Sequence, residues 1–185
     1  MLTLFHGSPI HFKEFAFQER NESLGIKYGC PIFLTDMELI AAISSHKVGG
    51  KEHFLYTVQI PDLTPENHLK ADVQPSNTII KRIEEKLRET IPAEAKSSGK
   101  ALKDWLYARP SNSSSDYEHE KEVIDLMDEL GIIAYVFQMK DYKSVFNYAV
   151  HCKQARIIKC EYINPKFERE ADGKSHLHIL DRKEV

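Results

Sequence analysis

The chain has 185 residues, of which 42% are hydrophobic and 29% charged, and its formal net charge is −3. This size and mixture are typical of a single globular domain with a substantial core, and the near balance of charge argues against a dedicated nucleic-acid binder. No apolar run reaches the ~20 residues of a membrane helix and no signal-peptide pattern is present, so we expect a cytoplasmic protein without a membrane partner.

The first sixty residues combine short apolar runs with loops. Strands are predicted at 2–6, 31–35 and 53–60. A helix is expected to follow the second of these strands, because Thr35 and Glu38 fit a capping box. The apolar residues Leu39, Ile40 and Ile43 recur behind this start at helical spacing and predict the buried face of that helix.

The middle of the chain, at about 61–115, predicts a helical insertion. Isoleucine and leucine recur at helical spacing beneath a charged face over 76–90, and a second short helix is expected over 100–109. We interpret Trp105 in this second helix as a core anchor rather than a contact to a target. Insertions on a rigid scaffold often set the choice of target, which is the role we expect for this one.

The last third of the chain predicts one helix followed by strands. The helix begins at Ser115 and ends at Gly131, a residue type that commonly follows a helix end. The predicted strands are 132–138, 144–152, 155–163 and 177–180. Helices and strands are segregated rather than alternating, so the predicted fold class is α+β.

The strand at the N-terminus ends in His6, Gly7 and Ser8, a combination suited to binding a ligand. An imidazole at a strand end can hydrogen-bond a pair of hydroxyls such as those of a ribose, and a glycine beside it allows a planar ligand to approach the backbone. Phe33 on a facing strand would supply a stacking surface, with Thr35 nearby. A turn glycine and a Thr35 that only caps its helix would explain the same residues without a ligand.

Several common kinds of catalytic and nucleotide-binding site are excluded because their sequence motifs are absent. The sequence contains no phosphate loop, no GxGxxG turn, no GxSxG elbow and no HExxH motif. His176 and His178 could share one face of a strand, but no third metal ligand lies near them in the sequence. We therefore expect no metal site.

Three segments together resemble the ADP-ribosyltransferase fold of the diphtheria-toxin and PARP-like branch. They are "LFHGS", then "GCPIFLTDMELIAA", and finally "LMDELGIIAYVFQ" followed by "NYAVHCKQARIIK". The segments are also similar to small phage-encoded and bacterial toxin-type members, including an anti-CRISPR ADP-ribosyltransferase. The resemblance implies split antiparallel β-sheets with flanking helices, and a single domain over 1–185 that contains the helical insertion.

The resemblance also implies how the chain would bind NAD as its substrate. His6 would hydrogen-bond the adenosine ribose, the Gly7 backbone would hold the nicotinamide amide, and Ser8 would lie close to that ribose. Phe33 would stack on the nicotinamide and Thr35 would line the same pocket.

Two further residues complete the predicted cofactor-binding set. Tyr28, in the loop before the Phe33 strand, would cover the other face of the nicotinamide. Gln138, at the end of its strand, is a polar candidate facing the cleft, although exposure at a strand end explains it equally well.

The catalytic acid is where the chain departs from the family. Asn147 stands where many members carry a catalytic glutamate, and an amide cannot act as a base. Glu118 would supply the charge, as an aromatic-Glu pair does in the phage-type members. Glu118 could instead only cap its helix by pairing with Ser115, or the acid could be Glu120 or Glu22. The predicted catalytic set is His6, Glu118 and Asn147.

The function implied is an NAD-dependent ADP-ribosyltransferase of the toxin or effector type, which releases nicotinamide and modifies a macromolecular target. The expected target is a host protein, with a nucleic acid as an open alternative. A different class remains open, a non-catalytic module that binds NAD, ADP-ribose or a partner, and Asn147 supports it. An RNA 2′-phosphotransferase is disfavoured because no Arg/Lys cluster lies beside the His-Gly pair.

Overall fold

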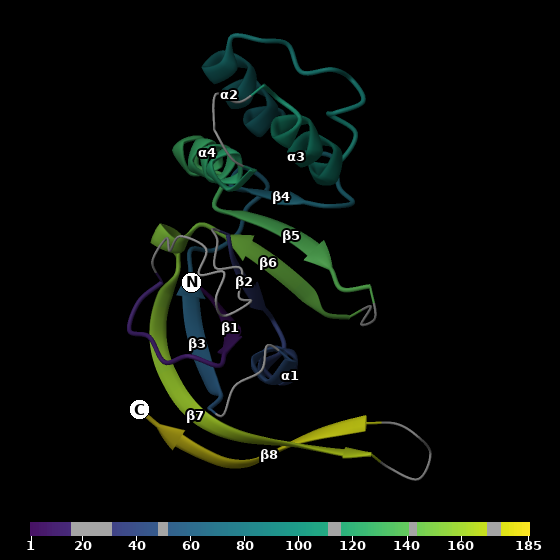
Figure 1. Cartoon of the computed structure of the whole chain (residues 1–185). Helices are drawn as coiled ribbons and strands as arrows, with labels where there is room; N and C mark the ends of the chain where they lie inside the picture. Colours follow the sequence, from purple (N-terminus) through teal and green to yellow (C-terminus); the bar gives the residue numbers. More distant parts are fainter. Residues whose placement is uncertain (16–30, 48–51, 111–115, 141–143, 170–174) are drawn as a thin grey trace.

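The structure is a computed structural model that describes residues 1–15, 31–47, 52–110, 116–140, 144–169 and 175–185 (Figure 1). In chain order the elements are β1 (Leu2–Ser8), β2 (Ile32–Thr35), α1 (Glu38–Lys47), β3 (Phe54–Ile60), β4 (His68–Lys70), α2 (Asn77–Leu87), α3 (Gly99–Tyr107), α4 (Asp116–Glu129), β5 (Ala134–Gln138), β6 (Phe146–Val150), a 3₁₀ turn (Cys152–Gln154), β7 (Arg156–Arg169) and β8 (Ser175–Glu184).

The described strands form one eight-stranded sheet with a weak join in its middle. Their order is β4-β5-β6-β2-β1-β3-β7-β8, and neighbours are antiparallel except for the parallel pair β4 and β5. β1 pairs with β3 along its whole length, but with β2 through the single register pair Phe5 and Thr35. We call this β1–β2 boundary the seam. It divides the sheet into a β4-β5-β6-β2 half and a β1-β3-β7-β8 half.

In the described part of the chain, a smaller hydrophobic cluster joins α1 to the sheet (Ala41, Ala42, Leu55 and Ile163), and two larger hydrophobic cores hold the rest of the molecule together. One lies on the sheet and includes Leu4, Leu34, Tyr56, Val58, Val136 and Val150. The other joins α2, α3 and α4 to β4 and includes Leu69, Ile79, Ile83, Leu102, Leu106, Val123 and Met127. We call these three helices the helical lobe. Full burial of each aliphatic side chain contributes roughly 1.5–3 kcal/mol, so the lobe has a core of its own.

The helical lobe and the β7–β8 hairpin lie at opposite ends of the sheet, and α1 packs against the sheet between them (Figure 1). Close packing of α1 on β1 depends on Gly7. A Cβ atom at Gly7 would lie 1.7 Å from the carbonyl oxygen of Ala41 in α1, a distance no real contact allows. A glycine is therefore required here by the approach of a helix backbone.

The lobe helices begin and end where the sequence predicts them to. Ser76 and Ser98 precede α2 and α3, and their hydroxyls accept hydrogen bonds from the Ile79 and Ala101 amides over 3.3 Å and 3.1 Å. After α4, Gly131 adopts a positive φ of 70°. The Ile132 amide then donates back to the Met127 carbonyl over 2.8 Å, which closes the helix end.

The α+β class is confirmed, and the expected strands and helices are present, but β7 and β8 are much longer than the predicted strands 155–163 and 177–180. β4, with only three residues, was not predicted. Leu39 was expected on the buried face of α1 but is 42% exposed, because Ile40, Ala41 and Ser45 face the sheet instead. The helical part also extends beyond residue 115, since α4 contributes to the lobe core.

Within the described ranges, no helix combines the length and the apolar character needed to span a membrane.

Candidate functional site

His6 lies at the seam, where the β1–β2 ladder is interrupted. Its ring Nδ1 atom lies 3.0 Å from the carbonyl oxygen of Phe33 on β2. A carbonyl only accepts hydrogen bonds, so Nδ1 donates the proton and the neutral ring keeps a lone pair on Nε2. The imidazole therefore presents a hydrogen-bond acceptor beside the seam.

Aromatic side chains hold the His6 ring in place. The ring centroids of Phe15, Phe12 and Tyr56 lie 5.4, 5.9 and 6.1 Å from that of His6. The Tyr56 hydroxyl accepts from the Phe12 amide over 2.8 Å and donates to the Ile10 carbonyl over 3.1 Å, which fixes this segment on the sheet. Burial lowers the pKa of His6 and outweighs the opposite effect of the Phe33 carbonyl. The ring is thus kept neutral.

A cavity of about 500 Å³ opens on the sheet face opposite to His6. Phe33, Tyr135, Phe137 and Ala149 form its sheet wall, because β2, β5 and β6 are paired in a register that places these residues on one face. The Phe33 side chain is 57% exposed. Its ring meets that of Phe137 edge to face at 6.4 Å, and Phe137 stacks on Tyr135 at 5.7 Å. This wall offers a surface for a flat aromatic group.

The helical lobe forms the other wall of the same cavity. Glu120, Ile124 and Met127 of α4 line it, spaced so that they share one helix face. From α3, Lys103 and Tyr107 line it as well. A volume of this size with mainly apolar walls and a few charged groups is typical of a small-molecule site.

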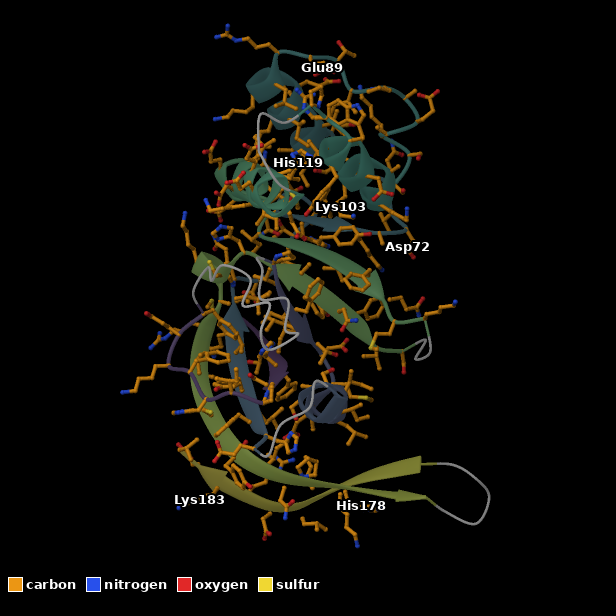
Figure 2. All side chains as sticks on the ribbon, viewed as in Figure 1. Asp72, Glu89, Lys103, His119, His178 and Lys183 are labelled. Carbon is orange, nitrogen blue, oxygen red and sulfur yellow. The ribbon has the colours of Figure 1, made fainter. Side chains whose placement is uncertain are left out.

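The cationic side of the cavity comes from α3. The carboxylate of Asp104 accepts hydrogen bonds from both Lys100 and Lys103, and the Lys103 contact measures 3.0 Å. The hydrogen bond from Lys100 is the largest cause of the lowered pKa of Asp104. The Lys103 Nζ atom also lies 4.9 Å from the ring centre of Tyr107 and 5.4 Å from that of Tyr135. Figure 2 shows Lys103 between α3 and the strands below it. Two ammonium groups thus share the carboxylate of Asp104, and the pKa of Tyr135 is raised first by burial and then also by the charges of Asp104 and Asp72.

A half-buried hydrogen bond between a histidine and an aspartate borders the cavity. His151, which lines it and is 4% exposed, accepts from the Lys153 amide through Nδ1 over 3.2 Å, so its Nε2 donates to Asp125 over 3.1 Å. Burial raises the pKa of Asp125, but the hydrogen bonds from Lys121 and His151 outweigh this effect and the net pKa is lowered. Both nitrogens of His151 are engaged, so this pair ties α4 to the turn after β6.

The remaining residues of the His-Gly-Ser motif and Thr35 have local structural roles. Gly7 faces α1, as described above. Ser8 is buried and its hydroxyl accepts from the Ile10 amide over 3.0 Å. Thr35 is buried too, and its hydroxyl accepts from the Met37 amide over 3.3 Å, next to the start of α1. These contacts match the non-ligand interpretation of Gly7 and Thr35 that the sequence left open.

The structure separates the two candidate acids of α4. Glu120 lines the cavity that contains Phe33, whereas Glu118 is exposed and does not line it. Asn147, half-buried on β6, pairs directly with Thr35 and with Phe137 on its other side.

Of the four remaining candidates, the structure describes one, Gln138. Gln138 is exposed at the end of β5 and does not line the cavity. Tyr28, Glu22 and the proposed cap Ser115 lie outside the described residues.

Sequence reasoning missed most of the cavity. Tyr135, Phe137, Tyr107 and Lys103 were assigned only to a predicted strand or helix. A signal for the α4 wall was present, because Glu120, Ile124 and Met127 recur at positions i, i+4 and i+7. The pairing of this face with β5 was not visible, since it depends on contacts between distant segments.

Comparison with known proteins assigns no family. No family model and no curated protein matches the chain. One solved structure, described as "Crystal structure of an anti-CRISPR protein", is similar over 85% of this chain and 95% of that chain, with 13% identity and a TM-score of 0.37. A likeness of this degree supports no conclusion about fold or function.

Proposed function

We propose that the chain is an NAD-dependent ADP-ribosyltransferase that modifies a macromolecular target, in the first place a protein, and releases nicotinamide. The observation that carries this proposal is the seam between β1 and β2. There His6, held through Nδ1 by the Phe33 carbonyl, presents Nε2 as an acceptor, while the exposed Phe33 ring faces the cavity on the other side of the sheet.

Each end of NAD has a matching group at the seam. A ribose hydroxyl would donate to the neutral His6 ring, whose lowered pKa favours the acceptor form at neutral pH. The nicotinamide would stack on the exposed face of Phe33, in the cavity on the other side of the sheet. His6 and Phe33 are two of the residues to which the sequence resemblance assigns ligand contacts.

The proposed reaction breaks the bond between the nicotinamide nitrogen and the ribose carbon. The bonding electron pair leaves with the ring nitrogen, which gives neutral nicotinamide, while positive charge develops on the ribose as in glycoside hydrolysis. A lone pair of the acceptor group then forms a bond to the same carbon. The acceptor proton passes to a carboxylate, and that carboxylate also stabilises the developing charge.

We assign the carboxylate to Glu120 in preference to Glu118. Glu120 and Phe33 line the same cavity, whereas Glu118 does not line it. Asn147 pairs directly with Thr35 on the sheet face that carries Phe33, although it does not line the cavity; its amide can hydrogen-bond a ribose hydroxyl but cannot accept the proton. His6, Glu120 and Asn147 would thus act as ribose acceptor, base and orienting group.

A non-catalytic NAD-binding or partner-binding module is the second candidate, because Asn147 leaves the central strands without a carboxylate at that position. Such a module would be stabilised by NAD without consuming it.

Release of nicotinamide from NAD, measured with and without host lysate, tests the proposal. We expect release by the wild type, its loss in His6→Ala, and a loss of about a hundredfold in Glu120→Gln. Glu118→Gln is the matched control, since it changes the same group on the same helix, and we expect it to retain release. A chain that melts at a higher temperature with NAD but releases nothing would contradict the enzyme and support the binding module.

A further inference from the structure

The wall formed by the helical lobe has no role in the proposed reaction beyond Glu120. Yet α3 places a lysine and a tyrosine directly across the cavity from the aromatic sheet wall. Lys103 and Tyr107 line the cavity from one side, and Phe33, Tyr135 and Phe137 from the other. The two walls come from segments with separate hydrophobic cores.

We infer that the helical lobe completes the nucleotide site, and that the cavity holds the nicotinamide mononucleotide half of NAD between the sheet and α3. This inference rests on the proposed function for the identity of the ligand. Lys103 would bind the phosphate and the aromatic sheet wall would hold the pyridine ring. The lobe then determines affinity for the substrate itself, in addition to any role in target choice.

The charges around the cavity support a ligand with a cationic ring and an anionic phosphate. Lys100 and Lys103 both donate to the carboxylate of Asp104, so two ammonium groups are gathered on one side of the cavity. An ammonium group is an effective point-charge partner for phosphate. Glu120 on α4 and the face of Phe33 on the sheet wall would favour the positive charge of the pyridinium ring.

Lys103 is also held in place before any ligand binds. Its Nζ atom lies over Tyr107 and Tyr135 at 4.9 and 5.4 Å, and the hydrogen bond to Asp104 measures 3.0 Å. Its side chain is 29% exposed, so it is partly desolvated but remains accessible from the cavity. A preorganised cation of this kind loses little side-chain entropy on binding.

Calorimetric titration of the full chain with nicotinamide mononucleotide tests this inference. We expect binding by the wild type and a loss of about tenfold or more in Lys103→Met, since a hydrogen bond to a charged group is removed. Lys103→Arg should retain binding. Lys81→Met, on the exposed surface of α2 and outside the cavity, is the matched control and should bind as the wild type does. The phosphate-free nicotinamide riboside should bind Lys103→Met and the wild type equally.

A second variant tests the cavity itself. Ala149→Phe adds a ring to the sheet wall and should abolish binding of nicotinamide mononucleotide, while a cooperative melting transition shows that the chain is folded. Binding that is unchanged in Lys103→Met and Ala149→Phe would overturn the inference. So would binding of AMP in place of nicotinamide mononucleotide with the same dependence on Lys103.

The inference and the proposed function fail in different ways. Suppose that nicotinamide release depends on His6, but that the KM for NAD is unchanged in Ala149→Phe and Lys103→Met. This result overturns the inference and leaves the proposed enzymatic activity standing. A chain that binds nicotinamide mononucleotide in a way that depends on Lys103, but releases no nicotinamide from NAD, supports the inference and contradicts the proposed enzymatic activity.

Discussion

The Nδ1 atom of His6 donates a hydrogen bond to the carbonyl oxygen of Phe33 over 3.0 Å, across the boundary where β1 and β2 share only one register pair. A side chain thus joins the two strands beyond the point where their backbone pairing stops. The same contact fixes the tautomer of the ring, because the carbonyl requires a donor.

This contact leads to a prediction about pH. Burial lowers the pKa of His6 below its usual 6.5, so between that lowered value and 6.5 the folded chain binds fewer protons than the unfolded chain. The stability that depends on neutral His6 is complete above the unfolded pKa and is lost as the pH falls toward the folded pKa. We expect the free energy of unfolding, measured by denaturant titration, to fall as the pH drops below about 6.5, the unfolded-state pKa.

The His6→Asn variant isolates this contribution, because its amide retains a donor for Phe33 and does not titrate. We expect its unfolding free energy to change less over the same pH range. An equally steep dependence in the variant would assign the proton uptake to other histidines.

A second prediction concerns the contact between β1 and α1. Gly7→Ala places a methyl group 1.7 Å from the Ala41 carbonyl oxygen, and a backbone atom cannot move aside as a flexible side chain can. We expect a loss of about 3 kcal/mol of stability, which corresponds to a fall in melting temperature of roughly 6–12 °C for a chain of this length. Ser44→Ala, on the exposed side of α1, is the control and should melt close to the wild type. A wild-type melting temperature in Gly7→Ala would show that α1 does not pack on β1 as described.

The sequence predicted the lobe helices well, because their signals are local. Ser76 and Ser98 at the helix starts and Gly131 at a helix end need no distant partner to act. The three-residue strand β4 gave no such signal, since a strand of this length is formed by pairing with β5 alone. Local pattern is therefore sufficient for α2 and α3 and insufficient for β4.

The candidate site was predictable only in part, for the same physical reason. His6 and Phe33 were singled out from their motifs, and the structure connects them by a hydrogen bond. The wall formed by Lys103 and Tyr107 was not predicted, because it depends on how the lobe packs against β5. The choice between Glu118 and Glu120 likewise depends on which face of α4 meets the sheet.

A third prediction concerns the half-buried pair that ties α4 to the turn after β6. Asp125→Ala leaves the Nε2 donor of His151 buried without its acceptor, and we expect a loss of about 1–3 kcal/mol in unfolding free energy. Lys121→Ala removes the other partner of the same carboxylate, an exposed pair, and should cost less than about 1 kcal/mol. Thermal unfolding of both variants measures the difference. Equal losses would mean that His151 contributes no more than the exposed lysine.

A fourth prediction tests the position that departs from the resembled family. Asn147→Glu places a carboxylate beside Thr35, on the sheet face that also carries Phe33. If NAD is cleaved at this face, the added charge should stabilise the cationic ribose by ~3 kcal/mol and raise the rate of nicotinamide release by about a hundredfold. The half-buried position of Asn147 leaves room for the longer side chain at modest cost.

Asn147→Gln controls for side-chain length, because it has the size of the glutamate without its charge, and it should show no gain. Introducing Asn147→Glu into a Glu120→Gln chain asks whether a carboxylate on β6 can replace the one on α4. Recovery of nicotinamide release in that double variant would mean that both positions face the same ribose. An Asn147→Glu chain that folds and binds NAD but releases nicotinamide no faster would show that the scissile bond lies away from β6. The carboxylate that the proposed reaction requires would then also lie away from β6.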